Sequence, residues 1–181
     1  MGKLILILGG SRSGKSKYAV SLAKRFKSKV AFIATAIPKD TEMKRRIKLH
    51  KLYRPKHWEL IEESKDINPV LSGLDAKVDV ALIDCLGLLI SNLLLENLSD
   101  KAIEAKIGEL LDTIEQAKFI TILVSNEVGC GIVPDNALAR RFGDLVGLAN
   151  QVIANKAGEV IFMQAGIPQI IKGGDTDAKI G

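Results

Sequence analysis

The chain has 181 residues, of which 47% are hydrophobic, 26% charged and 4% aromatic, and its formal net charge is +5. These proportions are those of an ordinary globular protein, and no repeat or low-complexity segment interrupts them. The positive charge would suit an anionic substrate. Because no basic block with interleaved aromatic residues is present, a lysine-rich solvated surface explains the charge, and we expect no nucleic-acid partner.

Apolar runs alternate with helical periodicity along the chain. In chain order these patterns predict a strand at residues 3–8, a helix at 14–26, a strand at 30–35, a helix at 41–52, a strand at 58–61, a short helix with turns at 65–77, a strand at 78–85, helices at 86–96 and 100–117, a strand at 119–125, a helix at 137–156, and strands at 160–163 and 169–171. This alternation predicts an α/β fold, a three-layer sandwich with a largely parallel sheet.

Two of the predicted helices carry distinctive apolar patterns. The apolar stretch at residues 86–95 is too short for a membrane span and is expected either in the core or at a contact between subunits. In the helix at 137–156, Leu138, Phe142, Leu145 and Leu148 are expected to form the apolar stripe.

A phosphate-binding loop follows the first predicted strand. Its sequence is Gly9, Gly10, Ser11, Arg12, Ser13, Gly14, Lys15 and Ser16. This is the P-loop pattern G-x-x-x-x-G-K-[ST] in the strand–loop–helix context that gives it meaning. Backbone N–H groups can turn toward the phosphates, Lys15 can reach the β- and γ-phosphates, and Ser16 can offer its hydroxyl to Mg2+. Arg12 has an equally good explanation as an exposed loop charge. Residues 1–181 are therefore expected to form a single P-loop nucleotide-binding domain.

Asp84 ends the apolar strand predicted at residues 78–85. In P-loop proteins a carboxylate at this position holds Mg2+, directly or through water, and Mg2+ prefers hard oxygen ligands. The alternative is an N-cap for the following helix. Cys85 and Cys130 form no C-x-x-C pair, so we expect neither zinc nor a disulfide framework, and we expect a cytoplasmic setting.

The predicted helix at 41–52 contains His50 among several cationic side chains. Met43, Ile47 and His50 fall on one helical face, which favours a core-facing, hydrogen-bonded histidine. A neutral imidazole is also a competent nucleophile toward phosphorus near pH 7. The residues alone leave both interpretations open.

The sequence resembles the bifunctional adenosylcobinamide kinase / adenosylcobinamide-phosphate guanylyltransferase family of cobalamin biosynthesis. The resemblance covers almost the whole chain and includes the P-loop, the segments at residues 33–36 and 46–58, the block Asn-Glu-Val-Gly-Cys-Gly-Ile-Val-Pro at 126–134, and residues 140–142. The P-loop alone is generic, whereas the histidine segment and the block at 126–134 are far more specific.

The resemblance implies two reactions. A nucleoside triphosphate, ATP or GTP, gives its γ-phosphoryl group to the aminopropanol hydroxyl of adenosylcobinamide. GTP then gives its GMP unit to the new phosphate, through a covalent guanylyl-histidine, and releases pyrophosphate. The position that matches the histidine nucleophile is His50, with Lys15 as the second catalytic residue.

Further roles are carried over from the family one residue at a time. The positions expected to contact the nucleotide outside the P-loop are Thr35, Ala36, Ile37, Lys51, Leu52, Tyr53, Arg54, Glu62 and Asp84. Asp84 is Glu in some relatives, and its shorter reach puts direct metal ligation in question. The block at 126–134 follows a predicted core strand and is expected to form a loop close to the active site, with Glu127 as a candidate catalytic residue. The alternative is a turn built by its glycine and proline residues.

The sequence also leaves two alternative functions open. One is a small-molecule P-loop kinase without nucleotidyl transfer, and the other is a nucleotide-dependent switch that is not an enzyme. The sequence lacks the Asn-Lys-x-Asp type of guanine motif, which disfavours the switch. The expected partners are adenosylcobinamide and its phosphate, with no membrane span, and the resemblance suggests a homo-oligomer, specifically a trimer.

Overall fold

The computed structural model describes residues 3–26, 29–38, 41–42, 44–45, 53–74 and 77–173. Its strands are β1 (Leu4–Gly9), β2 (Val30–Ala34), β3 (Glu59–Glu62), β4 (Val80–Asp84), β5 (Ile120–Asn126), β6 (Glu159–Gln164) and β7 (Ile167–Lys172). Its helices are α1 (Lys15–Arg25), α3 (Ile67–Ser72), α4 (Leu86–Leu95), α5 (Asp100–Gln116) and α6 (Ala137–Lys156). The predicted helix at 41–52 and the tail after Gly173 lie largely outside the described residues.

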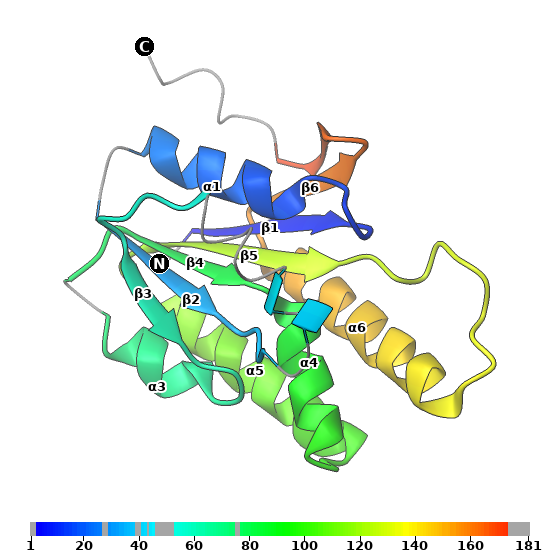
Figure 1. Cartoon of the computed structure of the whole chain (residues 1–181). Helices are drawn as coiled ribbons and strands as arrows, with labels where there is room; N and C mark the ends of the chain where they lie inside the picture. Colours follow the sequence, from blue (N-terminus) through cyan, green and yellow to red (C-terminus); the bar gives the residue numbers. More distant parts are fainter. Residues whose placement is uncertain are drawn as a thin grey trace.

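Within the described part of the chain, the strands form one sheet of seven in the order β3-β2-β4-β5-β1-β6-β7. All neighbouring pairs are parallel except β6 and β7, which form an antiparallel hairpin. Figure 1 shows α1 on one face of the sheet and α3, α4, α5 and α6 on the other. The prediction of a three-layer α/β sandwich with a largely parallel sheet is therefore confirmed.

Strand β1 shows why its sequence is apolar without interruption. Leu4, Leu6 and Leu8 pack into the core that also contains α4, α5 and α6, whereas Ile5 and Ile7 pack on the opposite face, against α1. Successive side chains of a strand point to opposite faces, so a strand covered by helices on both sides needs apolar residues at every position. This double burial holds β1, and the loop that follows it, in a fixed place.

The structure decides between the two explanations of the apolar stretch at 86–95 and corrects the apolar stripe predicted for the helix at 137–156. The stretch at 86–95 is α4, whose apolar side chains are almost all buried in the chain's own core, so burial explains its composition without a subunit contact. The predicted stripe of α6 is half wrong. Leu145 is buried, but Leu138 and Leu148 are 47% and 49% exposed, because the helix instead buries Val146, Ala149, Asn150 and Ile153.

Parallel strands place all their carboxyl ends at one edge of the sheet. The P-loop follows β1 at this edge, and Thr35, Asp84 and Asn126 lie at or just after the ends of β2, β4 and β5. In open α/β sheets, ligands bind in the crevice outside the carboxyl ends of the strands. We call this side of the molecule the carboxyl edge.

The fold predicts that two apolar substitutions lower the free energy of unfolding by very different amounts. Leu82→Ala in β4 removes a fully buried side chain and should lower the free energy of unfolding by about 2–5 kcal/mol, through lost burial and a residual cavity. Ile132→Ala, at a side chain that is 97% exposed, should change it by less than about 0.5 kcal/mol. Urea unfolding of both variants measures the difference, and equal losses would contradict the described core.

Candidate functional site

The turn between β1 and α1 needs glycine at two positions. Gly14 has φ +93°, a left-handed conformation that side chains rarely adopt. A methyl group at Gly9 would lie 2.7 Å from the main-chain oxygen of Met163 in β6 and 2.5 Å from Ser13 Oγ. Gly10, in contrast, has room for a side chain. Two of the three predicted glycine positions therefore have a steric reason in the structure.

The loop presents helix α1 to the carboxyl edge. Gly14 caps this helix without a side-chain hydrogen bond, and no acidic residue lies in its first turn. The first N–H groups of a helix carry its positive dipole end and form a ready site for an anion. The hydroxyl of Ser13 is buried and, within the described residues, has no hydrogen-bond partner. Ser11 and Arg12 are exposed at the tip of the loop, where Arg12 has φ +57°.

Lys15 and Ser16 occupy the first turn of α1 and point to different partners. The ammonium group of Lys15 donates to the main-chain oxygen of Gly10 at 3.0 Å, across its own loop. Ser16 Oγ donates to Asp84 Oδ1 at 3.2 Å, which joins the helix to the end of β4. Since β5 lies between β1 and β4, this bond connects α1, the helix that follows β1, to a strand that does not pair with β1. The structure thus brings together the two predicted Mg2+ ligands.

Asp84 is almost fully buried, with 9% of its surface exposed. Its negative charge acts on the neighbouring thiol of Cys85. Burial, reinforced by the charge of Asp84, raises the pKa of Cys85 to about 12, so the thiol stays protonated at physiological pH. Cys85 is therefore neither a nucleophile nor a metal ligand in this state.

Mg2+ would fit the Ser16–Asp84 pair. Both side chains offer hard oxygens at the phosphate-binding loop, which is the donor chemistry that Mg2+ prefers. Among the described residues, no three His, Cys, Asp or Glu side chains gather as an all-protein metal site would require. A metal at this pair would depend on phosphate oxygens and water for its other ligands, as is usual for Mg2+ bound with a nucleotide.

Thr35, after β2, is fully buried and both functions of its hydroxyl are used. Thr35 Oγ1 donates to the main-chain oxygen of Cys85 at 2.7 Å and accepts from the N–H of Cys85 at 2.8 Å. Asn92 of α4 donates to the main-chain oxygens of Thr35 and Ser64, at 2.9 and 3.0 Å. We call these contacts the Thr35–Asn92 clasp. It joins the segments that follow β2, β3 and β4, and leaves the half-buried Ala36 and Ile37 next to it.

Asn92 is not among the site residues predicted from the sequence. A buried asparagine in the otherwise apolar helix 86–95 was the available signal, because a buried amide needs hydrogen-bond partners. Its partners are 28 and 57 residues away in sequence, so the pattern could not identify them.

The other predicted nucleotide contacts lie at different distances from the P-loop. Glu62 is exposed at the carboxyl end of β3. Tyr53 accepts a hydrogen bond on its main-chain oxygen from Lys24, 3.4 Å away, near the end of α1, and Arg54 lies 5.2 Å over the ring of Phe32. Lys24 is nine residues beyond Lys15, about 13 Å along the helix at the usual rise. The structure therefore does not bring Tyr53 and Arg54 to the P-loop.

The predicted nucleophile His50 and its neighbours Lys51 and Leu52 lie outside the described residues. Their predicted roles stay predictions.

The end of β5 lies directly beside the P-loop. Asn126 pairs with Gly9 in the sheet, and the N–H of Glu127 donates to the main-chain oxygen of Gly9 at 3.0 Å. Ser125 donates to Asn150 of α6 at 2.6 Å, and Asn150 donates to the main-chain oxygen of Asn126 at 3.0 Å. Sequence reasoning missed Asn150, which is buried on the apolar face of its helix. The block at 126–134 therefore begins at the carboxyl edge, beside the P-loop.

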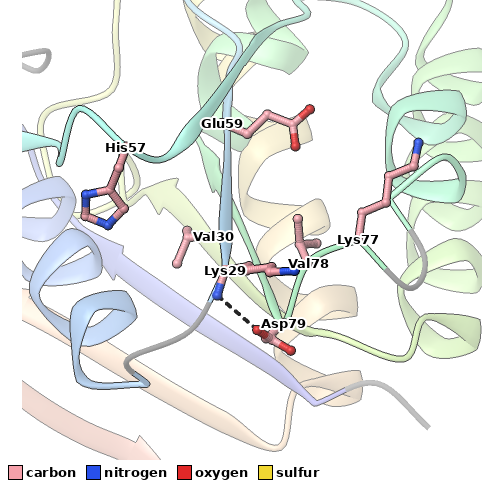
Figure 2. A pocket seen from close by; sticks show the side chains of 7 residues that line it. All are labelled: Lys29, Val30, His57, Glu59, Lys77, Val78 and Asp79. Atoms are coloured by element: carbon pink, nitrogen blue, oxygen red, sulfur yellow. Dashed lines mark hydrogen bonds between the residues drawn. The ribbon is translucent and has the colours of Figure 1, made fainter.

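His57 lies at the opposite edge. It lines a pocket of about 480 Å³ together with Glu59, Lys77 and Asp79 (Figure 2). In this pocket the N–H of Lys29 donates to Asp79 at 2.9 Å. The pocket is at the amino-terminal ends of parallel strands, because Lys29, His57 and Asp79 precede β2, β3 and β4 and Glu59 is the first residue of β3. His57 is therefore separated from the P-loop by the length of the sheet.

This is a P-loop protein of the α/β class. Its buried strand β1 leads through a glycine turn into a helix that begins at Lys15, and the next strand but one in the sheet supplies the carboxylate of Asp84. The sequence profile of the cobinamide kinase / cobinamide phosphate guanyltransferase family, CobU, matches residues 5–171. The chain belongs to this family. No helix in the described ranges has the length and apolar character needed to cross a membrane.

Individual relatives agree with the family match. The bifunctional adenosylcobalamin biosynthesis protein CobP of Pseudomonas aeruginosa is 40% identical over 168 residues, which cover 93% of this chain and 96% of that protein. The bifunctional adenosylcobalamin biosynthesis proteins CobU of Escherichia coli and Salmonella typhimurium are 36% and 37% identical, each over 93% of this chain and 99% of the relative.

The environments of the two cysteines predict unequal reactivity. Both thiols are free, but Cys130 is exposed and Cys85 is buried with its pKa raised to about 12. Because the thiolate is the reactive form, a disulfide reagent at pH 8 should modify Cys130 first and Cys85 at least about 100-fold more slowly until the protein unfolds. The Cys130→Ser variant should lose the fast phase. Two equally fast thiols in the folded protein would contradict this environment for Cys85.

Proposed function

We propose that this chain catalyses both reactions for which its family is named. In the first, a nucleoside triphosphate phosphorylates the aminopropanol hydroxyl of adenosylcobinamide. In the second, GMP passes from GTP to adenosylcobinamide phosphate, which gives adenosylcobinamide-GDP. The observation that carries the proposal is the Ser16–Asp84 contact at the P-loop, in a chain whose family match runs over residues 5–171.

In both reactions the P-loop holds the triphosphate. The N–H groups at the start of α1 and the ammonium group of Lys15 lie where negative charge on the phosphates needs stabilising. The contact between Lys15 and Gly10 keeps this cation at the loop, so it can turn to a phosphate without crossing solvent. Mg2+, held by Ser16 and Asp84, would neutralise charge on the β- and γ-phosphates.

We infer that His50 is the nucleophile of guanylyl transfer. The support is its match to the histidine segment of the family and the nucleophilicity of a neutral imidazole near pH 7. A bond forms between an imidazole nitrogen and the α-phosphorus, and the bond from that phosphorus to the bridging oxygen breaks, so pyrophosphate leaves. The phosphate of the corrinoid then displaces the histidine and takes the GMP unit. This step should follow ping-pong kinetics.

The remaining predicted nucleotide contacts, at residues 35–37, 51–54 and 62, belong to the same proposal. Tyr53 and Arg54 can serve it only if the segment that carries them shifts toward the P-loop when nucleotide binds, since they contact the far part of α1 and Phe32. Ala36 and Ile37 already lie at the carboxyl edge.

We also propose that residues 1–181 act as one catalytic domain within a homo-oligomer, a trimer by the family resemblance. A subunit contact would cover exposed apolar side chains, and one group of them among the described residues lies on α6 and the loop before it: Ile132, Val133, Leu138, Leu148 and Val152. An exposed thiol at Cys130 and no disulfide partner for it suit a reducing, cytoplasmic compartment.

GTP labelled on its α-phosphate tests the covalent step. The protein should retain label that is acid-labile and alkali-stable, as a phosphoramidate is. His50→Ala should retain none, yet should keep much of its kinase activity. His57→Ala is the matched control, since His57 lines the pocket at the opposite edge of the sheet, and it should be labelled normally.

Three other outcomes would each favour a different function of the chain or of His50. Kinase activity without label in the wild type would favour a small-molecule kinase with no nucleotidyl transfer. Nucleotide binding with neither activity would favour a switch. Loss of both activities in a folded His50→Ala variant would assign His50 another role.

A further inference from the structure

The two reactions differ in one chemical need. The acceptor in guanylyl transfer is a phosphate monoester, whose second pKa of about 6 leaves it ionised and nucleophilic at neutral pH. The acceptor in phosphoryl transfer is an aliphatic alcohol, which must lose a proton as its oxygen bonds to phosphorus. A positioned carboxylate or imidazole commonly takes that proton. One of the two reactions therefore needs a base, and the other does not.

The described carboxylates of the carboxyl edge are not equally placed for this task. Asp84 accepts the hydroxyl of Ser16 at the predicted metal position. Glu62 and Glu63 follow β3, which β2, β4 and β5 separate from the P-loop strand. The carboxylate of Glu63 accepts the N–H groups of Lys65 and Asp66 at 2.8 and 3.0 Å, which lower its pKa and make it a poor base.

Glu127 follows β5, the strand that lies between β1 and β4 and pairs with β1. Its N–H donates to the main-chain oxygen of Gly9 at 3.0 Å, so its backbone is fixed to the first residue of the loop. Its side chain is half-buried, and Oε1 accepts the N–H of Gly129 at 2.7 Å. A methyl group at Gly129 would lie 3.1 Å from that oxygen, so glycine leaves the carboxylate room. One bond orients the group, and the other oxygen can face an acceptor.

Buried polar contacts from α6 fix the end of β5, just before Glu127. Asn150 joins the side chain of Ser125 to the main-chain oxygen of Asn126. Such a satisfied buried network fixes geometry in a way that an exposed loop does not. After Gly129 the loop is exposed, which Figure 1 shows as the long excursion between β5 and α6.

We propose that Glu127 is the base of the phosphoryl-transfer step, an inference that rests on the proposed function. The acceptor oxygen forms a bond to the γ-phosphorus while its proton passes to the Glu127 carboxylate. The bond from the γ-phosphorus to the β,γ-bridging oxygen breaks, and its electron pair leaves with the nucleoside diphosphate. The proton then goes from Glu127 to water. Guanylyl transfer to the phosphate monoester makes no use of this carboxylate.

The test measures the two reactions separately on Glu127→Gln, with adenosylcobinamide and ATP for one and adenosylcobinamide phosphate and GTP for the other. A general base contributes about 10²–10⁴-fold, so kcat of phosphoryl transfer should fall at least about 100-fold. The kcat of guanylyl transfer should be much less affected, so that the ratio of the two rates changes by at least about 30-fold, an order-of-magnitude bound from the same base contribution. The residual phosphorylation should rise with pH, as hydroxide replaces the base. Glu127→Asp should recover part of the rate.

Glu104→Gln is the matched control, because Glu104 is an exposed carboxylate on α5, and it should leave both rates unchanged. Equal phosphorylation rates in Glu127→Gln and Glu104→Gln would overturn the proposal. An equal fall of both reactions in Glu127→Gln would also overturn it, since it would make Glu127 a support of the loop. If Glu127→Gln does not fold, Glu127→Asp decides through its ratio of the two rates. Wild-type protein without kinase activity would count against the proposed function instead.

Discussion

The hydrogen bond from Ser16 Oγ to Asp84 Oδ1 is the contact on which the candidate site depends. It is 3.2 Å long and joins the first turn of α1 to the end of β4. Helix α1 follows β1, and β5 lies between β1 and β4 in the sheet. The bond therefore requires both this strand order and the burial that holds β1 and β4 in register. A shift of one residue in either strand would move its polar end group to the wrong face. The core therefore determines the geometry of the phosphate site.

Two buried polar networks extend this constraint along the carboxyl edge. The Thr35–Asn92 clasp ties the segments after β2, β3 and β4 together, and Asn150 does the same for the end of β5. Buried polar groups are costly unless they are paired, and a fully paired network fixes a single arrangement. In this chain the Asn150 contacts lie at the strand that pairs with β1, and the Thr35–Asn92 clasp reaches Cys85, the residue after Asp84. They preorganise the edge before any ligand arrives, which is where enzymes gain from rigid geometry.

The sequence predicted the local features of the site and missed those that depend on contacts far along the chain. The P-loop, its strand and helix, and Asp84 follow a short motif and an apolar run, and the structure has their elements within a residue or two of the predicted bounds. Asn92 and Asn150 were missed because their partners are distant in sequence. The apolar stripe of α6 was half wrong because helical periodicity gives several candidate faces, and packing against α4, α5 and β1 selects one. The role of His50 rests on resemblance, since the described residues do not include it.

In the proposed function, Ser16 and Asp84 hold the metal ion of a metal–triphosphate complex at the P-loop. Mn2+ can replace Mg2+ in such a site and is visible by electron paramagnetic resonance. With a non-hydrolysable GTP analogue, the protein-bound Mn2+ should show coupling to 31P of the nucleotide. Its affinity should fall about 10-fold or more in Asp84→Asn, as expected when a close metal ligand or its support is lost. Unchanged Mn2+ affinity in both Asp84→Asn and Ser16→Ala would contradict the account.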